Sequence, residues 1–244
     1  MARRNARAPL DVYLNGRSVG RLHRAASGAI DFQYDAEWLR WSSAIPVSLS
    51  LPLREDRFIG QRVITVLDNL LPDNEAIRHR LAETTRADGD DAYSLLTAIG
   101  RDCVGALQFL PQGEEPQAAG AVSGRRVSDA EIGKIIANLA QSPLGIGSDN
   151  EFRISIAGAQ EKTALLFWNG RWHVPHGTTA TTHILKPQLG MLPNGIDMSH
   201  SVENEHLCLR IAEALGLPAA KSEIKDFAGR RVLAVERFDR FWTR

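Results

Sequence analysis

Short stretches of alternating hydrophobic and polar residues mark the first third of the chain, as expected for strands that bury one face. Residues 10–22 alternate on both sides of Asn15-Gly16, a dipeptide typical of a two-residue hairpin turn. Residues 30–34 alternate as well, and residues 45–53 predict an edge strand because prolines interrupt them. Helical spacing predicts helices over residues 63–71, 76–82 and 93–99, followed by a strand over 104–110.

The second half shows the same two periodicities in another order. Ser128 and Glu131 form a capping-box pattern that opens a run of isoleucines at helical spacing. A second helix is predicted over residues 202–215, with Leu207, Ile211 and Leu215 on one face. Strands are predicted over residues 152–156, 162–168, 171–174 and 181–185, and a final hairpin over 222–235.

A change in composition suggests where the chain divides. Residues 112–126 are rich in Gly and Ala and lack large apolar side chains, which is typical of a linker. We therefore expect a mixed strand–helix subdomain over residues 1–115, a linker over 116–126 and a second domain over 127–244. The predicted fold class is α+β, with a mainly antiparallel sheet and one helix packed on it in the second domain.

Composition and charge exclude several classes of protein. The chain has 244 residues, and its 29 Lys and Arg balance its 29 Asp and Glu, whereas non-specific nucleic-acid binding needs an excess of positive charge. No apolar run approaches the roughly 20 residues of a membrane span or forms a signal peptide. Cys103 and Cys208 are too few for a disulfide scaffold, and we expect both to be buried. We expect a cytoplasmic protein without a membrane partner.

Residues 155–163 contain the first candidate for chemistry. Ala157-Gly158-Ala159-Gln160 is a turn of mostly small residues between predicted strands, where backbone N–H groups can approach a phosphate. It is not a Walker A loop, because Glu161 precedes Lys162 and a strand follows. A strand–loop–strand cover over the ATP phosphates is the arrangement of protein kinases. The alternative interpretation is an ordinary hairpin turn.

Lys186 closes the strand predicted before residue 187 and is the second candidate. A lysine there can pair with α- and β-phosphates, as in kinases, or can simply extend to water. The following helix carries Glu203 and Glu205, and Glu205 shares a face with apolar residues, so it can point toward the strands. Kinases use such a glutamate to hold the lysine. The alternative is that both glutamates are solvated and favour the helix N-terminus.

The order of these features is that of a kinase N-lobe: phosphate loop, lysine strand, glutamate helix and two more strands. Residues 236–240 then lie where a chain would cross from N-lobe to C-lobe. The backbone groups of this segment can form hydrogen bonds with an adenine. These stretches resemble the HipA family of bacterial toxin kinases. The matching segments are residues 152–162, 184–187, 202–205 and 235–240, and in the first half residues 70–74 and 100–107.

The resemblance implies a serine/threonine kinase with an α/β N-terminal region and an all-helical C-lobe. It implies that residues 156–162 form the ATP-phosphate loop, that Lys186 is the ATP-phosphate lysine, and that the adenine hinge includes Glu236 and Phe238. The ATP-binding residues so implied are Ile156, Ala157, Gly158, Ala159, Gln160, Glu161, Lys162, Lys186, Glu236 and Phe238. Ser155 matches a serine that the family autophosphorylates, which expels the loop and switches the kinase off.

The same resemblance implies cofactors and partners. ATP and Mg²⁺ are the expected cofactors, and the expected partners are a HipB-type helix-turn-helix antitoxin, operator DNA reached mainly through it, and glutamate–tRNA ligase as protein substrate. The base and the metal-holding residues of the family lie in the C-lobe, and the residues after Lys186 show neither. We therefore expect catalytic and metal-holding residues beyond Arg244, and a chain that does not turn over ATP by itself.

Two other functions stay open at this point. The chain can be a naturally short, non-catalytic binding module that sequesters an antitoxin, a kinase or a nucleotide. It can also be a different nucleotide-dependent transferase that uses the same lobe.

Overall fold

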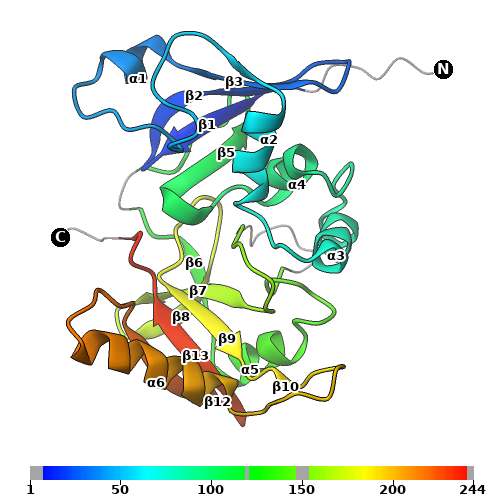
Figure 1. Cartoon of the computed structure of the whole chain (residues 1–244), viewed down its shortest axis with the longest axis vertical. Coiled ribbons are helices and arrows are strands. Elements are labelled where there is room, and N and C mark those ends of the chain that lie inside the picture. Colours follow the sequence, from blue (N-terminus) through cyan, green and yellow to red (C-terminus); the bar gives the residue numbers. More distant parts are fainter. Residues whose placement is uncertain (1–7, 119–120, 147–153, 241–244) are drawn as a thin grey trace. The chain divides into compact units, whose positions relative to one another are not determined.

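A computed structural model describes residues 8–118, 121–146 and 154–240 of the chain (Figure 1). Two compact units emerge from it. The first unit contains Met1–Ala121 together with Arg153–Gly158, and the second contains Val122–Phe152 together with Ala159–Arg244. The sequence analysis expected a continuous second domain from residue 127, whereas the described part of the short segment 153–158 clusters with the first unit.

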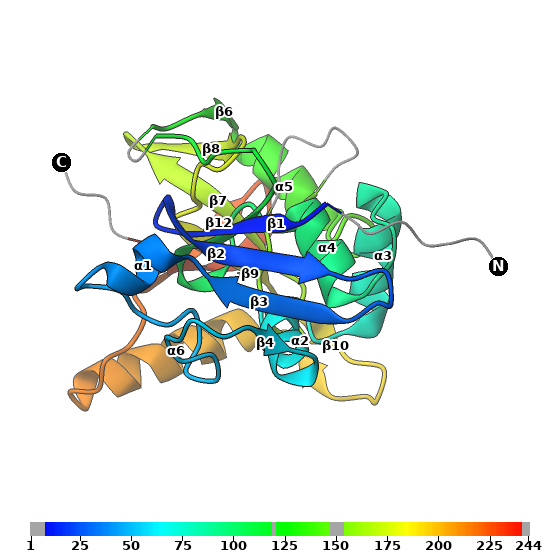
Figure 2. The same ribbon diagram turned by 90° about the horizontal axis from the view of Figure 1, so that it is seen from above.

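The first unit is built around an antiparallel sheet with the strand order β4-β3-β2-β1-β5 (Figure 2). Its strands are β1 (Leu10–Leu14), β2 (Arg17–Arg24), β3 (Ile30–Tyr34), β4 (Phe58–Ile59) and β5 (Leu107–Pro111). The helices are α1 (Ala36–Arg40), α2 (Gln61–Asp68), α3 (Glu75–Thr85) and α4 (Ala92–Ile99), with a 3₁₀ turn, η1 (Val104–Ala106). The predicted first hairpin is confirmed, with Asn15 and Gly16 both at positive φ as a type I′ turn requires.

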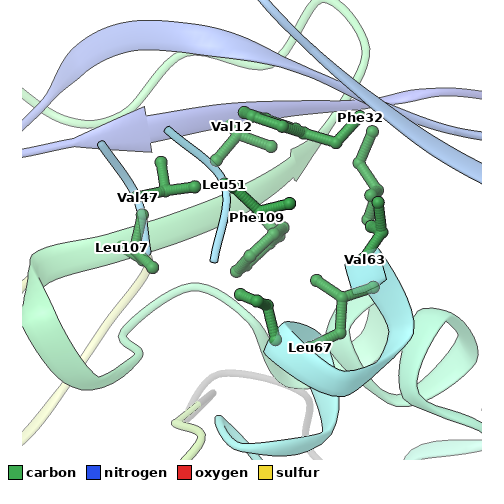
Figure 3. A pocket seen from close by; sticks show the side chains of 10 residues that line it. Val12, Phe32, Val47, Leu51, Val63, Leu67, Leu107 and Phe109 are labelled. Carbon is green, nitrogen blue, oxygen red and sulfur yellow. The ribbon is translucent and has the colours of Figure 1, made fainter. Parts of the chain in front are cut away.

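The core of the first unit lies where α2 packs on the sheet. Apolar side chains from β1, β3, β5 and α2 converge there around a cavity of about 10 Å³ (Figure 3). The side chains that surround it include Val12, Phe32, Val63, Leu67 and Phe109. Because a cavity needs roughly 10–15 Å³ and polar partners to hold one water, this one is a packing gap in an apolar core.

The second unit has an antiparallel sheet with the strand order β12-β13-β9-β7-β8-β6. Its strands are β6 (Gly124–Arg126), β7 (Thr163–Trp168), β8 (Arg171–Pro175), β9 (His183–Pro187), β12 (Ser222–Phe227) and β13 (Arg230–Glu236). The helices are α5 (Asp129–Ala137) and α6 (Ser201–Ala214), and a small separate hairpin joins β10 (Gly190–Met191) to β11 (Asp197–Met198).

Helices α5 and α6 cover opposite faces of this sheet. Leu185 of β9 belongs to the apolar core that includes Ile132 and Ile136 of α5. The next residue, Lys186, contacts α6, because successive side chains of a strand point to opposite faces. Gly133 permits the close approach of α5, since a Cβ at this position would lie 2.6 Å from the backbone oxygen of Phe227. The sequence analysis expected one helix on this sheet, whereas α5 and α6 both pack against it.

Three predicted elements are wrong in part. Residues 45–53 form a turn, in which the Leu51 N–H donates to the Ser48 carbonyl, because Pro46 and Pro52 supply no N–H for a ladder. Residues 154–156 are not a strand either, whereas the rest of that prediction lies outside the described residues. The strand predicted over 104–110 begins only at Leu107.

Two further expectations need correction. The end of the expected linker forms β6, which pairs with β8 and so extends the sheet. Cys103 is buried as expected, but Cys208 is exposed, because it lies on a helix whose one buried side chain among the described residues is Val202. Across the described residues, no helix combines the length and the apolar character that a membrane crossing requires.

Candidate nucleotide site

An ion pair between Lys186 and Glu205 is the central feature of the second unit. Lys186 lies near the end of β9, and its Nζ donates to Glu205 Oε1 over 2.6 Å. Lys186 is opposite Leu233 in the pairing of β9 with β13, and Leu233 is fully buried. The lysine therefore has an apolar neighbour on one side and a carboxylate on the other. Such a cation is held in place while part of it still faces solvent.

A second contact joins the same strand end to the start of α6. The carboxamide of Gln188 accepts from the Val202 N–H over 2.9 Å and from the Ser201 hydroxyl over 3.1 Å. Its Nε2 donates to Glu203 Oε2 over 2.6 Å. Gln188 thus satisfies one of the helix N–H groups that have no partner within the helix.

Glu203 receives a further hydrogen bond from the neighbouring strand. Arg231 Nη1 of β13 donates to Glu203 Oε1 over 2.6 Å. The hydrogen bonds from Gln188 and from Arg231 hold the pKa of the Glu203 carboxyl at about 2. Glu203 therefore stays ionised at any pH near neutrality.

The second half of the predicted phosphate loop lies next to the lysine strand. Gln160 Nε2 donates to the Pro187 carbonyl over 3.0 Å, which ties the loop to the residue after Lys186. Ala159 is exposed, whereas Lys162 is buried just before β7. In this half of the loop, the small residue Ala159 is therefore accessible to solvent next to Gln160, which is hydrogen-bonded to the lysine strand. Glu161 is half-buried.

The first half of the loop belongs to the first unit. Ile156 is buried, and Ala157 and Gly158 are partly exposed, with Gly158 at a φ of 107° that favours glycine. The structure describes these residues with the first unit and Ala159, Gln160, Glu161 and Lys162 with the second. Their common role in binding phosphate stays a prediction.

Ser155 is fully buried in the first unit. Its hydroxyl donates to the Leu70 carbonyl over 2.6 Å, and its backbone N–H donates to the Asp102 carbonyl over 3.1 Å. Both carbonyls lie in the two first-half segments, 70–74 and 100–107, that carry the family resemblance. These segments hold the serine in place.

The predicted hinge is fixed by a buried arginine. Arg237 donates through Nε and Nη2 to the two carboxylate oxygens of Asp239 over 3.0 and 2.9 Å, and through Nη1 to Thr181 Oγ1 over 2.8 Å. Its backbone N–H also donates to the Thr182 carbonyl. Phe238, between the paired residues, is 88% exposed.

The hinge strand also has a backbone contact at its end. The Glu236 N–H donates to the Lys221 carbonyl over 2.8 Å, so this N–H is engaged within the protein. The backbone that follows is shaped by the Arg237–Asp239 pair rather than by a strand ladder.

Sequence reasoning missed three residues that organise this region. Gln188, Arg231 and Arg237 each form side-chain hydrogen bonds that set the position of α6 or of the hinge. Gln188 lies two residues after Lys186, and Arg237 lies between Glu236 and Phe238. Their closeness to these positions, which the resemblance had marked, could have indicated a role for both residues. Arg231 had no such signal, because its partner lies 28 residues away.

The donor set suits a nucleotide better than a metal ion. A lysine beside a carboxylate at a strand end is suited to phosphate oxygens. Within the described residues, no group of three or more His, Cys, Asp or Glu side chains gathers as metal ligands would. Lys186 and residues of the loop 159–162 would hold the phosphates of a bound nucleotide.

Two family models match most of the chain. Residues 10–110 match the HipA N-terminal domain, and residues 154–244 match the HipA-like C-terminal domain. The solved HipA, HipB and operator DNA complex of Shewanella oneidensis includes a chain that is 28% identical to this one, with a TM-score of 0.71. The match covers 96% of this chain and 51% of that one.

Two curated relatives extend the comparison. Y4mE of Sinorhizobium fredii, named as a candidate kinase, is 35% identical over 95% of this chain. The serine/threonine-protein kinase toxin HipA of Shewanella oneidensis is 30% identical over 95% of this chain. These alignments cover 54% and 50% of the two relatives, so the chain spans about half of their length.

Proposed function

Because this chain belongs to the HipA family, we propose that it is the ATP-binding portion of a serine/threonine-protein kinase toxin from a toxin–antitoxin pair. Its relatives are named as kinases, and one of them as a kinase toxin. The chain spans about half of their length, so the activity proposed here is that of the whole protein to which such a portion contributes.

The observation that carries the proposal is the Lys186–Glu205 ion pair. In protein kinases a strand lysine pairs with a helix glutamate and binds the ATP phosphates, so this contact supports the same use of Lys186. Gln160, bonded to the Pro187 carbonyl, would keep the loop 159–162 beside the lysine. Backbone groups of Glu236 and Phe238 would form hydrogen bonds with the adenine.

ATP would supply the transferable phosphoryl group, and Mg²⁺ would neutralise its charge. The proposal assigns the metal-holding and base residues to the half of the relatives that this chain does not span. Residues of this chain would bind and orient the nucleotide. By itself the chain would bind ATP without turning it over.

Self-inactivation would act through Ser155. Its hydroxyl donates to the Leu70 carbonyl, and the segment is anchored further by the Asp102 carbonyl. A phosphoserine carries about −1.5 to −2 charges and accepts hydrogen bonds, so it could not keep a contact with a carbonyl oxygen. Phosphorylation would therefore release residues 154–158 from the first unit.

The partners would follow those of the solved relative. That complex contains HipB and operator DNA, which supports a HipB-type antitoxin for the protein proposed here and contact with DNA mainly through it. The zero net charge of the chain fits that indirect route. Glutamate–tRNA ligase is the proposed protein substrate on the family resemblance alone.

Lys186→Ala tests the proposal directly. We expect titration calorimetry to detect ATP binding by the unmodified chain and a loss of at least about tenfold in affinity for the variant, because a charge-assisted contact to phosphate is lost. Lys134→Ala, which removes an exposed lysine from α5, is the matched control and leaves the affinity unchanged. Equal ATP binding by the Lys186→Ala variant would refute the proposed site.

A further inference from the structure

We infer that Gln188 is a positioning residue of the nucleotide site: its carboxamide fixes the start of α6 and so keeps Glu205 against Lys186. This role rests on the proposed function, because it concerns the lysine that would bind ATP. The inference starts from an unusual helix start. His200, at the N-cap of α6, makes no side-chain capping bond within the described part of the chain.

Gln188 takes over the missing capping function from outside the helix. Its Oε1 accepts from the Val202 N–H, while the Ser201 hydroxyl bridges from Gln188 to the Leu189 N–H over 3.1 and 2.9 Å. Its Nε2 binds the Glu203 carboxylate. The first turn of the helix is therefore held by a residue that precedes it by more than a dozen positions.

The spacing along the strand couples this cap to the ion pair. Lys186 lies in β9, and Gln188 is the first residue after this strand, two positions further along the chain; both side chains contact α6. They reach α6 at Glu205 and at Val202, which are three residues apart on the helix, or about one turn. The helix is thus attached to the end of the lysine strand at two points that lie about one turn apart near its start.

Other contacts of α6 lead to different strands. Arg231 binds Glu203 from β13, and His206 bonds Ser222 at the start of β12 over 2.9 Å. These contacts attach the helix to β13 and β12, whereas Lys186 and Gln188 attach it at the end of β9. Because Val202 is the buried side chain of α6 among the described residues, packing adds little to this control. Gln188 therefore sets how Glu205 meets Lys186.

The carboxamide is needed because it both donates and accepts. A carboxylate at this position would still accept from Val202, but it would face the Glu203 carboxylate without a proton to share. The double change Gln188→Glu with Glu203→Gln restores a donor facing an acceptor. Arg231 can still donate to the amide oxygen at position 203, so the exchange preserves that contact as well.

The test compares Gln188→Glu, Glu203→Gln and the double variant in the 244-residue chain. One readout is the rate at which an amine-acylating reagent modifies Lys186, measured by peptide mass spectrometry, with exposed Lys134 as the internal reference. Glu205→Ala defines the rate of an unpaired Lys186. We expect Gln188→Glu to raise the Lys186 rate several-fold toward that value, and the double variant to return it to the original level.

The second readout is ATP affinity. We expect Gln188→Glu alone to lower this affinity by about five- to tenfold. In a chain that already carries Glu205→Ala, we expect the same substitution to lower the affinity much less, because the ion pair is already lost. Hydrogen exchange over residues 201–206 reports the helix start independently. Faster exchange with an unchanged Lys186 rate and unchanged ATP affinity would overturn the inference, because Gln188 would then only stabilise the helix.

The two proposals fail in different ways. If the unmodified chain binds no ATP, the proposed function fails, while the acylation rates still decide the role of Gln188. If Gln188→Glu does not fold, Gln188→Met removes the amide at similar length and is compared by the same acylation rate. A Lys186 rate equal to that of the unmodified chain in this variant also overturns the inference.

Discussion

Helices α5 and α6 pack on the same sheet of the second unit and are held there by opposite means (Figure 1). α5 buries Ile132 and Ile136 in an apolar core and opens with its own capping box, Ser128 with Glu131. α6 lacks such a cap within the described residues and is attached through Gln188 and other polar side chains. Helix α5 is thus held by apolar packing, and α6 is held mainly by hydrogen bonds and ion pairs.

The apolar residues of α6 complete the contrast. Leu207 and Ile211 of α6 and Leu215 at its C-terminal end are exposed by 50–73%. A helix held by packing keeps one position, because cores have few alternative arrangements. A helix held by a few polar bonds can shift when one of these bonds changes. We therefore associate α5 with stability and α6 with the adjustment of the proposed nucleotide site.

The largest expected difference between the helices concerns apolar truncation. Ile132→Ala in α5 is expected to lower the free energy of unfolding by about 2–5 kcal/mol, because it leaves a cavity in a fully buried core. Leu207→Ala in α6 is expected to change it by less than about 0.5 kcal/mol. Urea unfolding of the two variants measures both values, and similar losses would contradict the contrast.

A smaller effect is expected from the close contact of α5 with the sheet. Gly133→Ala would improve helix propensity, but its Cβ would lie 2.6 Å from the Phe227 oxygen and force the helix outward. We expect a net loss of about 1–3 kcal/mol, as for overpacked cores. Lys134→Ala is the control on the exposed side of the same helix. A gain in thermal stability for Gly133→Ala would show that α5 is not tightly seated.

The smallest expected effect is a change in the pKa of a glutamate, and each of the two helices has one such glutamate near its start. Bonds from Ser128 and Arg125 lower the pKa of Glu131 to about 2, and bonds from Gln188 and Arg231 do the same for Glu203. A lowered pKa means that the stabilising contact is complete above the unfolded value of about 4.5 and is lost as the pH falls toward 2.

We therefore expect both carboxyl carbon shifts to stay flat between pH 7 and 4 in a nuclear magnetic resonance titration. Gln188→Ala is expected to raise the pKa of Glu203 alone, because Glu131 has its own local partners. A shift of both glutamates in this variant would mean that the two helix starts are not independent.

Local signals made much of the fold predictable. Asn15-Gly16 marks a hairpin that the structure confirms, and Ser128 with Glu131 marks the capping box of α5. In each case the residues that determine the element are neighbours in the sequence. The Lys186–Glu205 contact was one of two interpretations that the sequence left open, and the structure shows it.

Long-range contacts were the part that the sequence did not reveal. Ser155 bonds to a carbonyl 85 residues away, and every residue has a backbone carbonyl, so the partner leaves no side-chain signal. The capping of α6 by Gln188 was missed for a related reason, since caps are normally sought next to the helix. The alternation of residues 45–53 predicted a strand that does not form, because two prolines remove the donors that a strand needs.

The membership of residues 154–158 in the first unit has a consequence for the synthesis of the protein. Ile154 and Ile156 are buried there, yet they emerge from the ribosome after the chain has already entered the second unit. At about 5–20 residues per second, they follow Ala121 by roughly 2–7 seconds. During this interval the first unit lacks two of its apolar side chains, and Ser155 becomes enclosed only when the segment arrives.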